Sequence, residues 1–335
     1  MTDHRTGLVR GVAITPGAAR RFLQMWGPLI ALAVLSLGFT FADPNFATPG
    51  NLQAIASRSA IPMVLVIGMT FVVIQGSIDL SVEGVMAVCS MSFALTVLNN
   101  RTGLDFGLLG GAAAILGGAA LGLLNGVVVV HLRVPSFMVT LGMWSFTYGI
   151  AMLLSGGEPP LIRDEMLRAF GLGSSLGIPN LVFLAVLCLA AGYVLQAYTR
   201  FGRYSYMIGG GEDLTRLSGI PVDRYKVMVF ALSGLMAGLA GVMESARIGV
   251  GHSEIGPGQM FAAITALVIG GTALSGGRGG VLHSAIGVLI LSVLGSGMVF
   301  LGISPYLQKA VQGAIILIAV IAATWHLRSR LRVVK

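Results

Sequence analysis

Residues 199–226 read TRFGRYSYMIGGGEDLTRLSGIPVDRYK, a charged and glycine-broken island between two long apolar runs. The island carries five of the 21 basic residues of the chain but only three acids, Glu212, Asp213 and Asp223. A polar segment of this size in so apolar a chain is typical of a docking surface. We therefore expect a soluble partner on the cytoplasmic side of a membrane to bind residues 199–226.

The composition of the whole chain sets its class. Hydrophobic residues make up 55% of the 335 residues, and charged residues make up only 10%. Soluble domains carry about 25% charged residues, so an ordinary soluble fold is excluded. The 48 glycines suit helices that pack closely in lipid, where small residues are favoured at contacts. The sequence predicts an all-α, polytopic membrane protein surrounded by lipid.

Apolar runs separated by polar breaks predict about ten transmembrane helices, since runs of roughly 17–25 apolar residues can cross a hydrocarbon core of about 30 Å. The runs lie near residues 25–42, 59–76, 82–98, 106–130, 136–155, 180–198, 226–246, 260–275, 281–302 and 308–325. The longest outer loop, 156–180, contains a short amphipathic helix near 163–170 in this interpretation.

The basic residues orient these helices. With a cytoplasmic N-terminus, 15 of the 21 Lys and Arg residues fall in cytoplasmic segments. This asymmetry follows the positive-inside rule and places both termini in the cytoplasm. Because the basic residues sit at helix ends and not in one patch, we expect no nucleic-acid partner. The predicted organisation is a disordered basic N-terminus (1–21), a transmembrane domain (22–326) and a basic cytoplasmic tail (327–335).

The run IGMTFVVIQGSIDLSV at residues 67–82 predicts a helix broken near 75–81. An aspartate at membrane depth is costly unless it faces protein or water. One interpretation is that Asp79 and its polar neighbours line a solute pathway at the break. The other is that Asp79 or Ser81 caps the next helix. The sequence leaves both open.

A second break is expected at residues 270–280, GGTALSGGRGG. Paired broken segments in two halves of a chain indicate a transporter with a site between the halves. No lysine of the chain follows a glycine, so the glycine-rich segment is not a phosphate-binding P-loop. No Cys/His spacing for a metal and no catalytic grouping is present. We expect no enzyme activity, no cofactor and no metal on this chain.

Two further patterns concern helix contacts. Small residues recur every four positions in the fourth run, at Gly110, Ala114, Gly118, Gly122 and Gly126. This stripe predicts close packing inside the subunit, with contact between subunits as the alternative. Glu244 and Arg247 are three residues apart, which predicts an ion pair within one helix or a contact for an external partner.

Several segments resemble the ribose-type permeases, the membrane subunits of bacterial ATP-binding-cassette (ABC) sugar importers. The resemblance runs from Leu29 to Ala323. It rests on DPNFATPGNL (43–52), the run at 67–82, the island at 199–226, ALSGLMAGLAGVMESAR (231–247) and ALVIGGTALSGGRGGV (266–281). The GSIDLSV element and the island together are specific to this family, whereas each alone is only suggestive.

The resemblance implies about ten helices per subunit and a pair of permease subunits around a central path. It also implies cytoplasmic ABC ATPase subunits that bind the ATP, and a periplasmic sugar-binding protein that delivers the solute. By this resemblance the ATPase-coupling residues within 199–225 are Gly209, Gly210, Glu212, Asp213, Arg216 and Gly219. A weakly polar translocation pathway would use Gln75, Ser77, Asp79, Asn125 and Thr140.

The chain departs from the family pattern in two places. Glu83 stands where the family usually has glycine. Residues 259–266, QMFAAITA, lack the two acids of the family's YELDAIAA segment at Met260 and Ala262. These changes put the solute and the pairing in doubt, and one explanation is a heterodimer whose other permease keeps the acids.

The sequence thus predicts the permease subunit of an importer for a monosaccharide such as ribose, xylose or galactose, in the bacterial inner membrane. The alternative is an ion-coupled secondary transporter of a small polar solute. Ion-coupled carriers usually keep several acids or a histidine relay at mid-membrane. The predicted spans place Asp79, Glu83 and Glu244 near breaks or ends, which favours the importer.

Overall fold

The computed structural model describes residues 16–254 and 258–324, and this part of the chain is mostly helical. The elements are α1 (Pro16–Ala42), η1 (Pro44–Ala47), α2 (Pro49–Ile74), α3 (Val82–Thr96), α4 (Leu108–His131), α5 (Ser136–Ser155), α6 (Glu165–Leu172), β1 (Ser174–Ser175), β2 (Ile178–Pro179), α7 (Asn180–Tyr198), α8 (Arg200–Gly210), α9 (Glu212–Leu217), α10 (Val222–Ile248), α11 (Gln259–Gly270), α12 (Val281–Phe300) and α13 (Pro305–Thr324).

The predicted membrane class is supported by helix length and composition. Among the described residues, six helices are long and apolar enough to cross a membrane: α2, α4, α5, α7, α10 and α12. Three shorter apolar helices, Trp26–Ala42, Val82–Thr96 and Gln259–Gly270, accompany them. Each of the ten predicted runs overlaps a helix, although ten crossings and cytoplasmic termini stay predictions.

Both predicted chain ends fall largely outside the described part. Helix α1 begins at Pro16, so it starts before the predicted disordered segment ends at residue 21. Residues 1–15 of that segment and the predicted tail at 327–335 lie outside the described residues.

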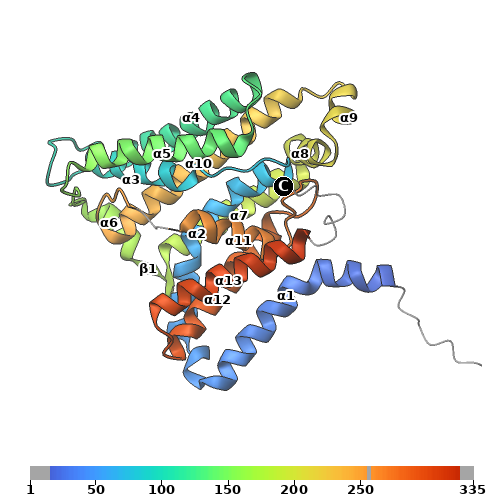
Figure 1. The fold of residues 1–335 in the computed structure, drawn as a ribbon. Helices are drawn as coiled ribbons and strands as arrows, with labels where there is room; N and C mark the ends of the chain where they lie inside the picture. The colour runs from blue at the N-terminus through green and yellow to red at the C-terminus, as the bar shows by residue number, and fades with distance from the viewer. Residues whose placement is uncertain (1–15, 255–257, 325–335) are drawn as a thin grey trace, which may run out of the picture.

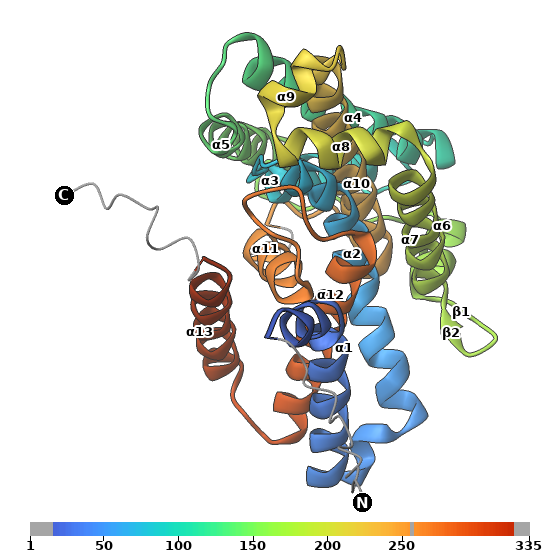
Figure 2. The same ribbon diagram turned by 90° about the vertical axis from the view of Figure 1, so that its right-hand side faces the viewer.

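The helices form two groups on either side of α2 (Figures 1 and 2). Helix α10 packs against α2, α3 and α4 in one group, and α11 and α12 pack together in the other. Helices α8 and α9 lie at one end of the molecule, and α6 with the β1–β2 hairpin lies at the opposite end (Figure 1). The described start of α1 and end of α13 point toward the α8–α9 end.

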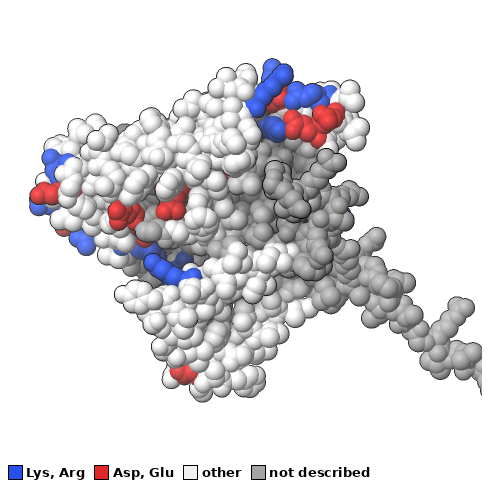
Figure 3. Space-filling view, viewed as in Figure 1, with Lys and Arg blue, Asp and Glu red and all other residues white. Residues whose placement is uncertain are grey.

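Charged side chains gather at the same two ends of the molecule. Figure 3 shows Lys, Arg, Asp and Glu gathered over the α8–α9 end and over the α6 end, with a largely uncharged band between them. At the α6 end, Asp164 caps the helix by accepting a hydrogen bond from the backbone N–H of Leu167 at 3.0 Å. The short helix expected near residues 163–170 is therefore confirmed as α6.

Both predicted breaks are confirmed. Helix α2 ends at Ile74 and α3 begins at Val82, while α11 ends at Gly270 and α12 begins at Val281. Gly76 has φ +77°, a left-handed conformation that other residues rarely adopt. The chain can therefore turn sharply after α2.

The small-residue stripe of α4 packs inside the subunit, as expected. A Cβ atom at Gly126 would lie 2.7 Å from Cα of Val227, and one at Gly118 would lie 2.6 Å from the carbonyl oxygen of Gly234. A Cβ at Gly122 would overlap the carbonyl oxygen of Phe230. The backbones of α4 and α10 are therefore in direct contact, which only small residues permit.

We expect Gly122→Ala to destabilise the protein by about 1–3 kcal/mol, because the added methyl group must push two packed helices apart. The measurement is thermal unfolding of the purified protein in detergent. Gly117→Ala on the same helix is the control, since a Cβ atom added there would meet nothing within 4 Å. Equal melting temperatures for the two variants would contradict the close approach of α4 and α10.

Candidate functional site

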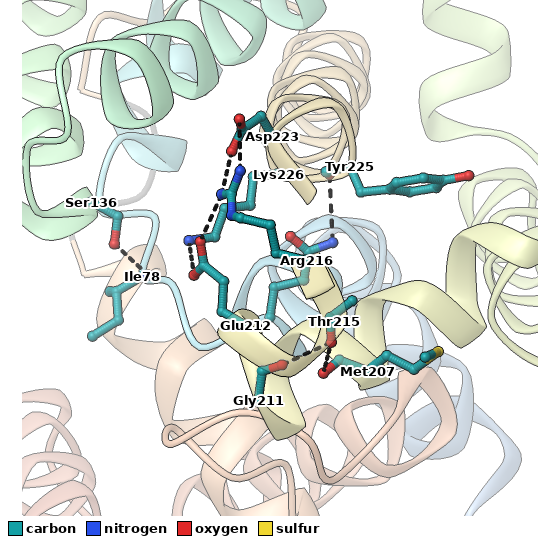
Figure 4. Close-up of polar contacts among 11 residues, drawn as sticks. Ile78, Ser136, Met207, Gly211, Glu212, Thr215, Arg216, Asp223, Tyr225 and Lys226 are labelled. Atoms are coloured by element: carbon teal, nitrogen blue, oxygen red, sulfur yellow. Dashed lines mark hydrogen bonds and ion pairs between the residues drawn. The ribbon is translucent and has the colours of Figure 1, made fainter. Parts of the chain in front are cut away.

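The charged island at residues 199–226 is folded into two short helices and the start of α10. Helix α8 occupies Arg200–Gly210 and α9 occupies Glu212–Leu217, with the turn at Gly211. The hydroxyl of Thr215 lies 2.8 Å from the carbonyl oxygens of both Met207 and Gly211, which ties α9 back onto α8 (Figure 4). The island is therefore an ordered helical hairpin.

Ion pairs connect α9 to the first turns of α10. Arg216 donates to both carboxylate oxygens of Asp223, at 2.6 and 3.1 Å, and to Glu212 at 3.4 Å. Lys226 binds the other oxygen of Glu212 (Figure 4). The hydrogen bond and charge of Asp223 raise the pKa of Arg216 above its ordinary value. Because Arg216 and Asp223 are about half exposed, their ion pair orients α9 more than it stabilises it.

Two leucines on α9 face solvent. Leu214 is 72% exposed and Leu217 is 84% exposed, and their spacing puts both on one side of the helix. Asp213 is also exposed, whereas Glu212 is half-buried by its ion pairs. Sequence reasoning missed these leucines, although two large apolar residues in a polar segment were a usable signal. Apolar side chains rimmed by charges are typical of a protein-binding surface.

Helix α8 touches both broken segments through Gly209. A Cβ atom at Gly209 would lie 2.6 Å from the backbone nitrogen of Gly277 and would overlap the carbonyl oxygen of Ile74. Gly277 itself donates a backbone hydrogen bond to that oxygen at 2.8 Å. The end of α2 and the loop after α11 therefore meet at one point on α8. We call these three residues, Ile74, Gly209 and Gly277, the glycine junction.

Two side chains hold the second break beside the glycine junction. The hydroxyl of Tyr206 on α8 donates to the carbonyl oxygen of Gly279 at 2.7 Å. Gln196 on α7 donates to the Tyr206 hydroxyl at 2.5 Å and accepts from the backbone N–H of Val281 at 2.6 Å. The segment between α11 and α12 is thus fixed by α7 and α8 together.

Asp79 lies at the centre of the first break and is only 1% exposed. One carboxylate oxygen accepts from the N–H and the hydroxyl of Ser81, at 2.9 and 2.6 Å. The other accepts from the hydroxyl of Ser233 on α10 at 2.7 Å. Asn125 on α4 donates to the Ser81 hydroxyl at 2.9 Å. Ser81 precedes α3 without a side-chain capping bond, so Asp79 does not simply cap α3 but joins Ser81 to a distant helix.

The other pathway candidates also surround this break. Gln75 donates to the hydroxyl of Ser205 on α8 at 3.0 Å. The hydroxyl of Thr140 on α5 accepts from the backbone N–H of Leu80 at 3.0 Å. Ser77 is buried in the break itself. The five candidates are therefore brought together, but each is buried and none faces open solvent.

The coupling candidates divide into two groups. Gly209 packs closely in the glycine junction, whereas a Cβ atom added at Gly210 or at Gly219 would meet nothing within 4 Å. Gly219 has φ +78° and lets the chain turn from α9 toward α10. Gly209 thus touches the membrane helices, and Glu212, Asp213 and Arg216 lie on the part of the α8–α9 hairpin that points away from them.

Comparison with known proteins identifies the class to which this fold and this hairpin belong. Residues 51–320 match the family model described as "Branched-chain amino acid transport system / permease component". The match covers most of the chain, so the chain belongs to this permease family. It is a multi-pass protein of the inner membrane and a component of an ABC importer, and it is not itself an enzyme. Permeases of this class work with ATPase and binding-protein partners.

Curated relatives share most of their length with this chain. The ribose import permease protein RbsC of Escherichia coli K12 is 38% identical over 317 residues, covering 92% of this chain and 97% of the relative. RbsC of Bacillus subtilis is 37% identical, covering 89% and 92%. The L-arabinose transport system permease protein AraH of E. coli K12 is 35% identical, covering 90% of each. No solved structure matches the chain.

Proposed function

We propose that this chain carries a monosaccharide, such as ribose, xylose or galactose, across the inner membrane with energy from separate ATPase subunits. The observation that carries the proposal is similarity to ribose and arabinose permeases over about nine-tenths of the chain. The family description names branched-chain amino acids instead. The similarity to individual sugar permeases extends over more of the chain and therefore favours a sugar.

Uptake by cells of the native host tests the solute class. Deleting the gene should abolish the accumulation of labelled ribose, arabinose, xylose or galactose and leave leucine uptake intact. Loss of leucine uptake alone would show that the transported solute is an amino acid and not a sugar. Uptake abolished by a protonophore while cellular ATP stays high would favour the ion-coupled carrier.

We further propose that the α8–α9 hairpin docks on the ATPases and that the glycine junction transmits its motion. Exposed Leu214 and Leu217 supply an apolar contact, and the surrounding charges supply its rim. The five buried residues Gln75, Ser77, Asp79, Asn125 and Thr140 form the polar frame of the first break, next to the translocation pathway. When ATP closes the ATPases, a pull on the hairpin would reach both breaks.

We expect charge reversal at Glu212 or Arg216 to reduce uptake strongly while membrane insertion stays normal. Glu212→Lys places a third cation beside Arg216 and Lys226, so α9 should swing away from α10. Uptake in cells and the amount of protein in the membrane are the two measurements. Normal uptake in both single variants would remove the coupling assignment. The double variant Glu212→Lys with Lys226→Glu restores one pair and should recover part of the uptake.

We propose that two permease subunits share the importer, either as two copies of this chain or as this chain with a second permease. Gentle detergent purification of the tagged chain from its host, followed by mass spectrometry, distinguishes them. A cassette ATPase in near-equal amount is expected. A single permease species in the active complex would reject the heterodimer, whereas a second permease would establish it.

A further inference from the structure

A group of aromatic and acidic side chains lies apart from the five buried pathway candidates. Trp144 and Tyr148 stand one turn apart on α5, with stacked rings whose centroids are 5.9 Å apart. The Tyr148 hydroxyl donates to Glu254 at 3.3 Å. Glu83 on α3 lies within electrostatic reach of Tyr148. We call Glu83, Trp144, Tyr148 and Glu254 the aromatic–acidic patch.

The patch lies at membrane depth. Helix α5 has 20 residues and is therefore about 30 Å long, and its two aromatic residues fall in its middle third. Gly84 fixes the level of Glu83 beside them, because a Cβ at Gly84 would lie 2.6 Å from the carbonyl oxygen of Trp144. Glu83 is thus held beside the centre of a helix that is long enough to cross the bilayer.

Local contacts hold both acids without neutralising them. Glu83 lies near the backbone of Gly258 and Met260, at the start of α11. The first turn of α11 has no acid of its own. The ion pairs within residues 16–254 and 258–324 involve other acids, so neither Glu83 nor Glu254 has a basic partner there.

Carboxylates at membrane depth are not stable against lipid chains, so lipid cannot be their neighbour. Acidic side chains in membrane-spanning regions face protein or a water-filled cavity, because hydrocarbon cannot solvate them. Glu254 is exposed and Glu83 is half-buried, so the described part of this chain does not enclose them. Figure 3 shows acidic side chains on the face beneath α5, with basic side chains just below them. This face of α3, α5 and the start of α11 is therefore covered by water or by another protein.

The chemistry of the patch suits a neutral solute with many hydroxyl groups. Carboxylate oxygens accept hydrogen bonds from hydroxyls, and the aromatic rings offer flat apolar surfaces to C–H groups. A few polar groups beside aromatic side chains are typical of small-molecule sites.

We propose that the aromatic–acidic patch lines the aqueous path and contacts the hydroxyl groups of the passing solute. This inference rests on the proposed sugar transport and adds the residues that touch the sugar. Glu83 and Glu254 accept from hydroxyls, and the aromatic pair forms the surface along which the sugar ring slides. The five buried candidates then frame the break behind this surface.

Cysteine accessibility tests the position of the path. In a variant lacking Cys89 and Cys188, one cysteine replaces Tyr148 and, separately, Phe146. Phe146 is 58% exposed and lies about 200° around the same helix. In membrane vesicles of the host, a charged, membrane-impermeant thiol reagent should label Tyr148→Cys and spare Phe146→Cys. Equal labelling of both, or no labelling of Tyr148→Cys because a second subunit covers it, would overturn the proposal.

Uptake of labelled ribose, arabinose, xylose and galactose tests the contact with solute. Glu83→Gln should lower uptake of the transported sugar about tenfold, the usual effect of losing one hydrogen bond to a charged group. Asp105→Asn, which changes an exposed loop acid, is the control. Wild-type uptake in Glu83→Gln would overturn the contact. If the wild-type protein accumulates none of these sugars, the proposed function fails, while the labelling result still reports where the aqueous path runs.

Discussion

Gly209→Ala should abolish coupled uptake while the protein still reaches the membrane. The new methyl group would overlap the carbonyl oxygen of Ile74 and press on the nitrogen of Gly277, so α8 must move away from both breaks. Overpacking of this kind costs about 1–3 kcal/mol, which shifts an equilibrium between two conformations by about 5- to 150-fold. The measurement is solute uptake together with ATP hydrolysis by the same purified complex.

The ratio of the two activities separates transmission from general damage. We expect ATP hydrolysis to persist while uptake falls, because the exposed residues of the α8–α9 hairpin are left intact. Gly295→Ala on α12 is the matched control, since a Cβ atom added there would meet nothing within 4 Å. If uptake and hydrolysis in Gly209→Ala both equal those of the wild-type protein, the glycine junction does not transmit the motion.

Asp79→Ala should destabilise the protein and stop transport. The substitution leaves the N–H and hydroxyl of Ser81 and the hydroxyl of Ser233 without their acceptor, in a site that water does not reach. Each buried polar group left unpaired costs about 1–3 kcal/mol. The melting temperature in detergent and solute uptake are the two measurements.

Asp43→Ala is the comparison variant, because it removes a single helix-capping hydrogen bond. Asp43 accepts one hydrogen bond from the N–H of Asn45 at 2.9 Å, so its loss should cost only about 0.5–2 kcal/mol. A melting temperature for Asp79→Ala no lower than that of Asp43→Ala would contradict the link to α10. A well-folded Asp79→Ala protein that does not transport would instead favour a direct role for Asp79 in the pathway.

The sequence predicted the features that depend on local chemistry. Residues 75–81 and 270–280 break helices because glycine and polar residues interrupt apolar runs. The four-residue spacing of small side chains predicted the contact surface of α4. The charges of residues 199–226 predicted an outward segment, although its helices α8 and α9 were not foreseen.

The remaining features depend on contacts between distant segments. Ser205 and Ser233 bind the first break, yet each is a single serine with no pattern around it. Gly209 looks like any other glycine of the island until the fold brings Ile74 and Gly277 against it. Glu83 is a departure from the family pattern, but its position beside the start of α11 required the folded chain. Partners of this kind carry no local signal.

The packing of α10 also bears on how the protein is made. Helix α4 packs most extensively against α10, and α10 follows it in the chain after α5, α6, α7, α8 and α9. During synthesis α4 must therefore stay in the bilayer with its glycine face uncovered until α10 has entered. Asp79 likewise lacks one of its hydrogen-bond donors until then, because Ser233 lies on α10. Insertion of α10 is thus the step that completes the packing of α2, α3 and α4. A nascent chain that stops before Val222 should therefore remain a target for membrane proteases.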